Sequence, residues 1–199
     1  MKKVIILGGS GYVGQHLMQG WAVSESDIQF YSVSRSGRPQ TILPKLQDVR
    51  VEWIKGDASN IDSFYDSLPD VADTVIDLVG TASGKSQTEF DHINSEPVNT
   101  MVEIMKRKAI HRGVYVSGVI GMPGTMKEFS SSKKRGEQIV RDSGLDIRII
   151  RPSLIYGDRK GVGTMVTIMR LAGLFCKKMA PVTVDKLSLK IIEATSAEK

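Results

Sequence analysis

Three glycines near the N-terminus have the spacing of a phosphate-binding turn. Gly8, Gly11 and Gly14 lie in the stretch GGSGYVG, after the apolar run VIIL and before an apolar helical pattern. A tight strand-to-helix turn favours glycine, and a pyrophosphate needs close access to backbone N–H groups at a helix N-terminus. The alternative is a tight turn that binds no ligand. The residues predicted to contact a dinucleotide here are Gly8, Ser10, Gly11, Tyr12, Val13 and Gly14.

The end of the second β-rich run indicates which dinucleotide fits. An acidic residue at this position binds the ribose 2′-hydroxyl of NAD, whereas an arginine accommodates the 2′-phosphate of NADP. The chain reads SVSRSGR over residues 32–38 and has no carboxylate there. Ser34 and Arg35 would bind the extra phosphate, with Arg38 as a further cation. The sequence therefore predicts NADP(H) in preference to NAD(H); the alternative for both arginines is a solvated surface.

Short β-rich runs alternate with helical segments along the chain. The β-rich runs are Lys3–Leu7, Ile28–Val33, Val49–Ile54, Thr74–Val79, Val114–Ser117 and Asp146–Arg151. The segments long enough for helices are Gly11–Val23, Asn60–Leu68, Phe90–Lys108 and Ser130–Ser143. Several runs are apolar on consecutive residues, which is typical of strands covered on both faces. The alternation predicts an α/β domain with a doubly wound parallel sheet.

The length of 199 residues fits a single domain. We expect a nucleotide-binding core over residues 1–157 and a short C-terminal helical cap over residues 158–199, because the pattern after Asp158 is helical and contains no strand long enough to extend the sheet. The single cysteine and the scattered histidines favour no metal site. The chain lacks a long apolar span and a signal-peptide pattern, so we expect a cytoplasmic protein.

The net positive charge of the chain is compatible with anionic binding partners. The chain carries 27 Lys and Arg against 22 Asp and Glu, a formal net charge of +5. The basic run at residues 133–135 is too short, and too poor in aromatic residues, to predict nucleic-acid binding. The segment 165–178, MVTIMRLAGLFCKK, would suit a helix on an anionic membrane surface or on a protein partner. Its alternative is a lid helix packed on the core, and the oligomeric state is not indicated.

Ordered motifs along most of the chain resemble the short-chain dehydrogenase/reductase superfamily, in its extended and atypical branches. Beyond the glycine turn, these motifs are Gly56-Asp57, Asp77-Leu78-Val79-Gly80, Asn94, Val114–Ser117, the stretch RPSLIYG at 151–157 and the stretch PVTVD at 181–185. The resemblance implies a Rossmann fold. It also implies cofactor contacts from Asp57 at the adenine, from Leu78, Val79 and Gly80 at the ribose, and from Pro152 near the nicotinamide.

The chain departs from the superfamily at its catalytic pair. Active members use Tyr-x-x-x-Lys, in which the tyrosine passes a proton to the substrate oxygen. Here Lys133 matches the lysine, which the resemblance implies holds the nicotinamide ribose, but Phe129 occupies the tyrosine position. The proton would then come from Ser117, Tyr156, a serine of 130–132 or water, and Tyr156 is the preferred surrogate. The loop at residues 80–86 lacks the spacing of a P-loop and is expected to cover the cleft.

These departures are most similar to atypical members related to a complex I accessory subunit and to a coenzyme Q accessory protein. The leading hypothesis is a weak or specialised NADP(H)-dependent oxidoreductase that acts on a small molecule and is linked to quinone metabolism. The second hypothesis is a non-catalytic NADPH-binding scaffold or redox sensor. The third is a sugar-nucleotide epimerase or dehydratase.

Overall fold

The computed structural model describes residues 1–121, 125–158 and 180–196. Within them, six parallel strands form one sheet in the order β3-β2-β1-β4-β5-β6. The strands are β1 (Lys2–Leu7), β2 (Ile28–Ser34), β3 (Val51–Lys55), β4 (Thr74–Asp77), β5 (Arg112–Val116) and β6 (Asp146–Ile150). The order reverses between β1 and β4, so the predicted doubly wound α/β fold is confirmed.

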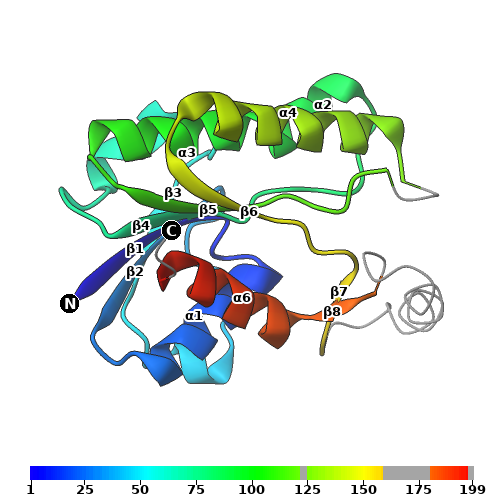
Figure 1. Ribbon diagram of the computed structural model, residues 1–199. Coiled ribbons are helices and arrows are strands. Elements are labelled where there is room, and N and C mark those ends of the chain that lie inside the picture. The colour runs from blue at the N-terminus through cyan, green and yellow to red at the C-terminus, as the bar shows by residue number, and fades with distance from the viewer. Residues whose placement is uncertain (122–124, 159–179, 197–199) are drawn as a thin grey trace.

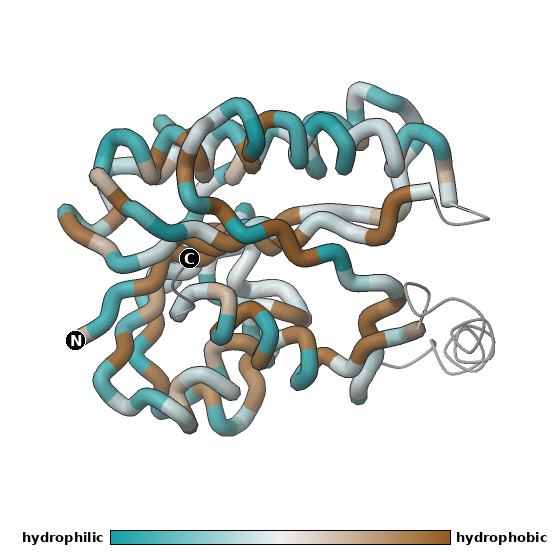
Figure 2. Tube along the Cα trace, in the orientation of Figure 1, coloured by the Kyte–Doolittle hydropathy of each residue, from teal (hydrophilic) through white to brown (hydrophobic). Residues whose placement is uncertain are grey.

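Helices cover both faces of the sheet (Figure 1). Helices α2 (Gln87–Asn94), α3 (Glu96–Arg107) and α4 (Lys127–Ser143) lie on one face, and α1 (Tyr12–Ser24) and α6 (Val184–Ser196) lie on the other. Consecutive apolar residues of β1 pack into opposite layers, Ile5 and Leu7 with α3 and Val4 and Ile6 with α1. Figure 2 shows the same division, with apolar residues concentrated in the strands and polar residues on the outer sides of the helices.

The C-terminal part returns to the core. Helix α6 packs against α1, and a short strand pair precedes it, in which β7 (Ile155–Tyr156) lies parallel to β8 (Val182–Thr183). This pair does not join the main sheet. The division of the chain at residue 157 stays a prediction. Among the helices of the described ranges, none combines the length and apolar character needed to cross a membrane.

The helix predicted over Asn60–Leu68 is wrong. The segment forms two short 3-10 turns, η2 (Ile61–Ser63) and η3 (Tyr65–Ser67), which follow the turn η1 (Pro44–Leu46). Asn60 accepts a hydrogen bond from the Asp62 N–H, and Ser63 Oγ donates to the carbonyl of Asn60. Short polar side chains that bond to the local backbone in this way compete with helical hydrogen bonds.

The single helix predicted over Phe90–Lys108 is two helices. Helix α2 ends at Asn94, and α3 begins at Glu96 with Pro97 in its first turn. Proline has no N–H to continue an α-helical ladder, but it is well tolerated in the first turn of a helix. Helix α4 also begins three residues earlier than predicted, at Lys127 instead of Ser130. The earlier start adds Phe129 to the helix that carries Lys133.

The glycine turn requires two positions without side chains for packing reasons. A Cβ atom on Gly14 would lie 2.4 Å from the carbonyl oxygen of Gly9, and a Cβ atom on Gly9 would lie 2.5 Å from Ser32 Oγ. Helix α1 therefore touches the backbone of the turn directly. Gly20, in the same helix, faces open space.

We predict that Gly14→Ala lowers the free energy of unfolding by about 1–3 kcal/mol, because the new methyl group has no room against Gly9. Gly20→Ala is the matched control, and it should raise the free energy of unfolding by about 0.5–1 kcal/mol through better helix propensity. Urea denaturation of both variants without dinucleotide is the measurement. Equal effects of the two substitutions would contradict the packing argument.

Candidate dinucleotide-binding site

Two adjoining cavities lie at the carboxyl ends of the parallel strands, where open α/β sheets bind ligands. The polar cavity, of about 610 Å³, is bordered by Ser10, Arg35 and Asp57. The apolar cavity, of about 810 Å³, is bordered by Tyr12, Phe129 and Lys133. Both cavities are lined by Gly8, Gly11, Leu78, Val79, Gly80 and Thr81. The two therefore form one continuous cleft across the point where the strand order reverses.

The glycine turn lines both cavities at the place where they meet. Gly8 has a φ of +83°, and its N–H donates to the carbonyl of Val33 at 2.8 Å. The Gly11 N–H donates to the carbonyl of Gly8 at 3.1 Å, and α1 begins at the next residue. Tyr12, Val13 and Gly14 line the apolar cavity, and the first turn of α1 has no acidic side chain. The positive end of the helix therefore borders the cleft and suits a pyrophosphate.

The turn after β2 supplies hydroxyls and a guanidinium to the polar cavity. Ser34, Arg35 and Ser36 line it. The Oγ atoms of Ser10 and Ser36 lie 3.5 Å apart, which brings this turn to the glycine turn. Ser34 Oγ donates to the carbonyl of Gly37 at 3.0 Å. Arg38 is exposed and is not among the described residues that border the cleft.

Asp57 also lines the polar cavity, and the preceding Gly56 N–H donates to the carbonyl of Ser34 at 3.0 Å. Asp57 Oδ1 accepts hydrogen bonds from the N–H of Ser59 at 3.0 Å and from Ser59 Oγ at 2.7 Å. The backbone hydrogen bond from Ser59 is the main reason that the pKa of Asp57 lies below its ordinary value, with help from the charges of His92 and Arg35. Asp57 is thus an ionised, oriented acceptor at the position where the resemblance implies an adenine contact.

Lys133 projects from α4 into the apolar cavity and is 3% exposed. A Cβ atom on Gly80 would lie 2.8 Å from the Lys133 Nζ atom, so the missing side chain of Gly80 makes room for the ammonium. The loop after Gly80 is fixed by Asn94, which accepts from the Thr81 N–H at 2.8 Å and donates to the Thr81 carbonyl at 3.1 Å. Residues 80–83 line the cleft, and the covering role of the loop 80–86 stays a prediction.

Ser117 follows β5 and is hydrogen-bonded to the buried carboxylate of Glu137, which also pairs with the exposed Arg151. Its Oγ donates to Glu137 Oε1 at 3.0 Å. Arg151 donates to both Glu137 oxygens, each at 2.6 Å. Burial raises the pKa of Glu137, but the hydrogen bonds from Arg151 and Ser117 outweigh it and hold that pKa below its ordinary value. The proton of Ser117 therefore faces an ionised carboxylate, although the residue lines the apolar cavity.

Phe129 and Tyr156 have different relations to the cavity. Phe129 lines it and packs edge-to-face on Phe90, with ring centroids 6.5 Å apart. Tyr156 lies half-buried in β7. Its neighbour Ile155 lines the apolar cavity together with Pro152, whereas Tyr156 is not among the described lining residues. The structure thus brings Lys133, Ser117 and Phe129 together and leaves Tyr156 at the periphery.

Two buried groups beside Lys133 are absent from the residues that the sequence singled out for the site. Asp77 is fully buried at the end of β4, and burial raises its pKa to about 7. Tyr115, also fully buried, has its ring centroid 5.3 Å from the Lys133 Nζ atom. A carboxylate inside the apolar run TVIDLV is the signal that could have identified Asp77.

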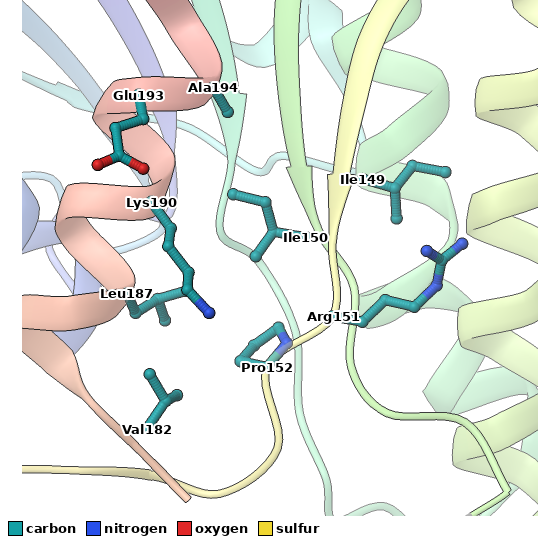
Figure 3. A pocket seen from close by; sticks show the side chains of 9 residues that line it. All are labelled: Ile149, Ile150, Arg151, Pro152, Val182, Leu187, Lys190, Glu193 and Ala194. Carbon is teal, nitrogen blue, oxygen red and sulfur yellow. The ribbon is translucent and has the colours of Figure 1, made fainter. Parts of the chain in front are cut away.

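A further groove lies between β6 and α6 (Figure 3). The Arg151 side chain at its rim points away from α6 and toward α4, and Lys190 points into the groove. Pro152 is the only predicted cofactor residue among its described lining residues. Because Pro152 also lines the apolar cavity, the groove adjoins the cleft at this residue. The segment 165–178, predicted to contact a membrane or a partner, lies outside the described residues.

Comparison with known proteins gives the same assignment as the geometry. A family model described as NAD(P)H-binding matches residues 8–175. The chain is 26% identical over 160 residues to the ceramide reductase of Caulobacter vibrioides, which covers 77% of this chain and 46% of that protein. It is 28% identical over 108 residues to the mitochondrial NADH-ubiquinone oxidoreductase 40 kDa subunit of Neurospora crassa, which covers 54% of this chain and 28% of that protein. The matched region spans less than half of either relative.

Solved structures share the fold. UDP-glucuronic acid 4-epimerase from Bacillus cereus, in complex with NAD, has a TM-score of 0.74 at 17% identity and covers 99% of this chain and 73% of that chain. A short-chain dehydrogenase/reductase from Veillonella parvula has a TM-score of 0.67 at 18% identity, with 100% and 88% covered. With the family match over residues 8–175, the chain belongs to the NAD(P)H-binding family, and it shares its Rossmann fold with the short-chain dehydrogenase/reductase from Veillonella parvula.

Proposed function

We propose that the protein is an NADP(H)-dependent reductase of an apolar carbonyl compound, of which a quinone is the leading example. The observation that carries this proposal is the position of Lys133. Lys133 lines the apolar cavity. The glycine turn lines this cavity too, and it also lines the polar cavity, so the lysine and the dinucleotide site share one cleft. A buried cation beside an apolar pocket suits an uncharged substrate with one oxygen to be polarised.

The preference for NADP(H) rests on the polar cavity. Ser34, Arg35 and Ser36 line it at the end of β2, where a carboxylate would select NAD(H). An arginine is always charged and binds phosphate oxygens through several N–H groups. Arg35 is the cation that would bind the 2′-phosphate, and Asp57 would accept a hydrogen bond from the adenine amine.

The walls of the apolar cavity support an apolar substrate. Its side chains beyond the glycine turn include Ala82, Val119, Met126, Phe129, Leu154 and Ile155. Phe129 presents a ring where a tyrosine hydroxyl would make the wall polar. The names of the two relatives refer to ceramide and to ubiquinone, both of which carry long apolar chains. These observations favour a substrate that buries apolar surface, and they support the link to quinone metabolism.

The residues divide the work of such a reaction. Bound NADPH supplies a hydride at C4 of its nicotinamide ring. Helix α1 and the glycine turn hold the pyrophosphate, while Lys133 holds the nicotinamide ribose. The apolar walls exclude water from the reacting carbonyl, which strengthens the field of the nearby ammonium.

Phe129 also supports a second candidate, a non-catalytic scaffold or redox sensor that binds NADPH. A site without the tyrosine can hold the dinucleotide without transferring a proton. The epimerase or dehydratase alternative has less support, because those reactions also need a proton-transferring group and the epimerase structures are similar in fold alone.

We predict that Arg35→Ala weakens NADPH binding by about 10- to 100-fold and changes NADH binding little. The reason is the loss of a charge-assisted contact, worth about 1.5–3 kcal/mol. Arg38→Ala is the matched comparison, and its smaller loss follows from its position outside the cleft. Fluorescence titration of both cofactors is the measurement. Tighter binding of NADH than of NADPH by the unmodified protein would overturn the preference.

We predict that Phe129→Tyr raises the rate of carbonyl or quinone reduction by NADPH at least about tenfold, because it adds a hydroxyl four residues before Lys133. Phe129→Leu is the control; it leaves the wall apolar and should not raise the rate. Stopped-flow measurement of NADPH oxidation against a panel of quinones and ketones tests both variants. If no variant turns over, and partner binding depends on the oxidation state of the dinucleotide, the sensor replaces the reductase.

A further inference from the structure

The carboxylate of Asp77 has no role in the cofactor contacts described above, and it is costly to bury. It lies at the end of β4, where its neighbours across the sheet are Leu7 on β1 and Tyr115 on β5. Leu7 and Tyr115 both pack into the layer of α3 and α4. Asp77 therefore belongs to the face of the sheet from which α4 presents Lys133.

One of the two carboxylate oxygens of Asp77 accepts a hydrogen bond, and the other has no hydrogen-bond partner among the described residues. Oδ1 accepts from the N–H of Val79 at 2.9 Å. Oδ2 is buried and has no hydrogen-bond partner among the described residues. A buried carboxylate with an unpartnered oxygen is strongly destabilising unless a cation lies nearby or a proton is bound. Lys133 is the buried cation of this layer, and its charge acts on Asp77.

The environment of Lys133 contains several titratable or charged groups. Asp77 faces it from β4, Tyr115 from β5, and Glu137 from its own helix. Burial raises the pKa of Tyr115 above its ordinary value, so its hydroxyl stays neutral. The charge of Glu137 is already matched by Arg151. Asp77 is therefore the anion left to balance the lysine.

Three hydroxyls that line the apolar cavity already donate elsewhere. Ser117 donates to Glu137, Thr81 Oγ1 donates to the carbonyl of Ser83, and Ser153 Oγ donates to the carbonyl of Ala180. An ammonium carries three protons, so Lys133 can bind the ribose and still offer one to a substrate. Phe129, at the tyrosine position, offers none.

We propose that Lys133 itself donates the proton that the missing tyrosine would give, and that Asp77 is the positioning residue that keeps this lysine charged inside the cavity. The inference rests on the proposed reductase function. In the step, hydride from NADPH adds to the carbonyl carbon of a ketone, and the C=O π pair moves onto oxygen; for a quinone, hydride adds to one oxygen and an electron pair moves through the ring onto the other. A Lys133 N–H bond breaks as its proton bonds to the oxygen that received the electron pair. The products are an alcohol or a hydroquinone, NADP⁺ and a neutral amine, which regains a proton from water or from the Asp77 carboxyl when that group is protonated.

The pKa of Lys133 in the presence of Asp77 is compatible with the loss and regain of the lysine proton. Burial lowers the pKa of Lys133 to about 8, although the carboxylates of Asp77 and Glu137 act to raise it. Reduction needs the charged lysine, so the rate is present below this pKa and is lost as the pH rises through it. Removing the negative charge of Asp77 lowers the pKa of Lys133 further, and the loss then occurs at lower pH.

The test compares the unmodified protein with Asp77→Asn, which keeps the shape of the side chain and an oxygen to accept from Val79. We expect the alkaline limb of the NADPH oxidation rate to move about one pH unit toward acid. A purely structural Asp77 would lower the rate at every pH without moving the limb. If Asp77→Asn is active and the alkaline limb of its pH–rate profile does not move, the inference is overturned but the proposed reductase function is not. Asp66→Asn, an exposed aspartate remote from the cleft, is the matched control.

A second readout does not depend on turnover. The pKa of Lys133 is measured by NMR of protein labelled with ¹³C-lysine, and Lys133→Arg identifies the resonance by its loss. The expected result is a value well below that of an ordinary lysine, and a still lower value in Asp77→Asn. An ordinary value near 10.4 overturns the inference even if Asp77→Asn fails to fold. If the unmodified protein binds NADPH but reduces no carbonyl, the reductase function and the donor role both fail.

Discussion

The shape of the site depends on the hydrogen bonds that the Glu137 carboxylate accepts from Ser117 and Arg151. This carboxylate joins three elements, because Glu137 belongs to α4, Ser117 follows β5 and Arg151 follows β6. A paired and fully hydrogen-bonded carboxylate of this kind gives more in specific geometry than in net stability. Helix α4 carries both Lys133 and Phe129. Its distance from the sheet therefore sets the depth of the apolar cavity and the distance that the Lys133 ammonium extends into it.

The cleft separates two kinds of recognition. Hydroxyls, a guanidinium, an imidazole and two carboxylates line the polar cavity, whereas the buried Lys133 cation lies among apolar walls in the other. The glycine turn and the end of β4 belong to both halves. Most residues that line the apolar half do not line the polar half, so the walls of the apolar half can change while the polar half keeps its residues. Gly80 and Gly14 lack this freedom, since a side chain would meet the Lys133 ammonium at Gly80 and the Gly9 carbonyl at Gly14.

The sequence predicts the sheet and the glycine turn well because both depend on local patterns. Apolar runs identify strands buried on both faces, and the glycine spacing follows from a local packing requirement. The failures have non-local or competing causes. The polar side chains of Asn60 and Ser63 bond to nearby backbone and prevent a helix. Pro97, visible in the sequence, separates α2 from α3. The pairing of Glu137 with Arg151 and the proximity of Asp77 to Lys133 depend on the fold, and no spacing reveals them.

The contact between α1 and α6 also constrains how the chain can fold. Residues 12–24 and 184–196 pack side by side. Helix α1 therefore cannot complete its packing until α6 is present. The opposite layer closes from segments nearer in sequence, since α2, α3 and α4 lie between residues 87 and 143. Contacts between distant segments carry a larger loop-closure cost and form late. During synthesis, the apolar side of β5 that contacts α6 stays incompletely covered until α6 has emerged, and we expect the chain to be most prone to aggregate in this period.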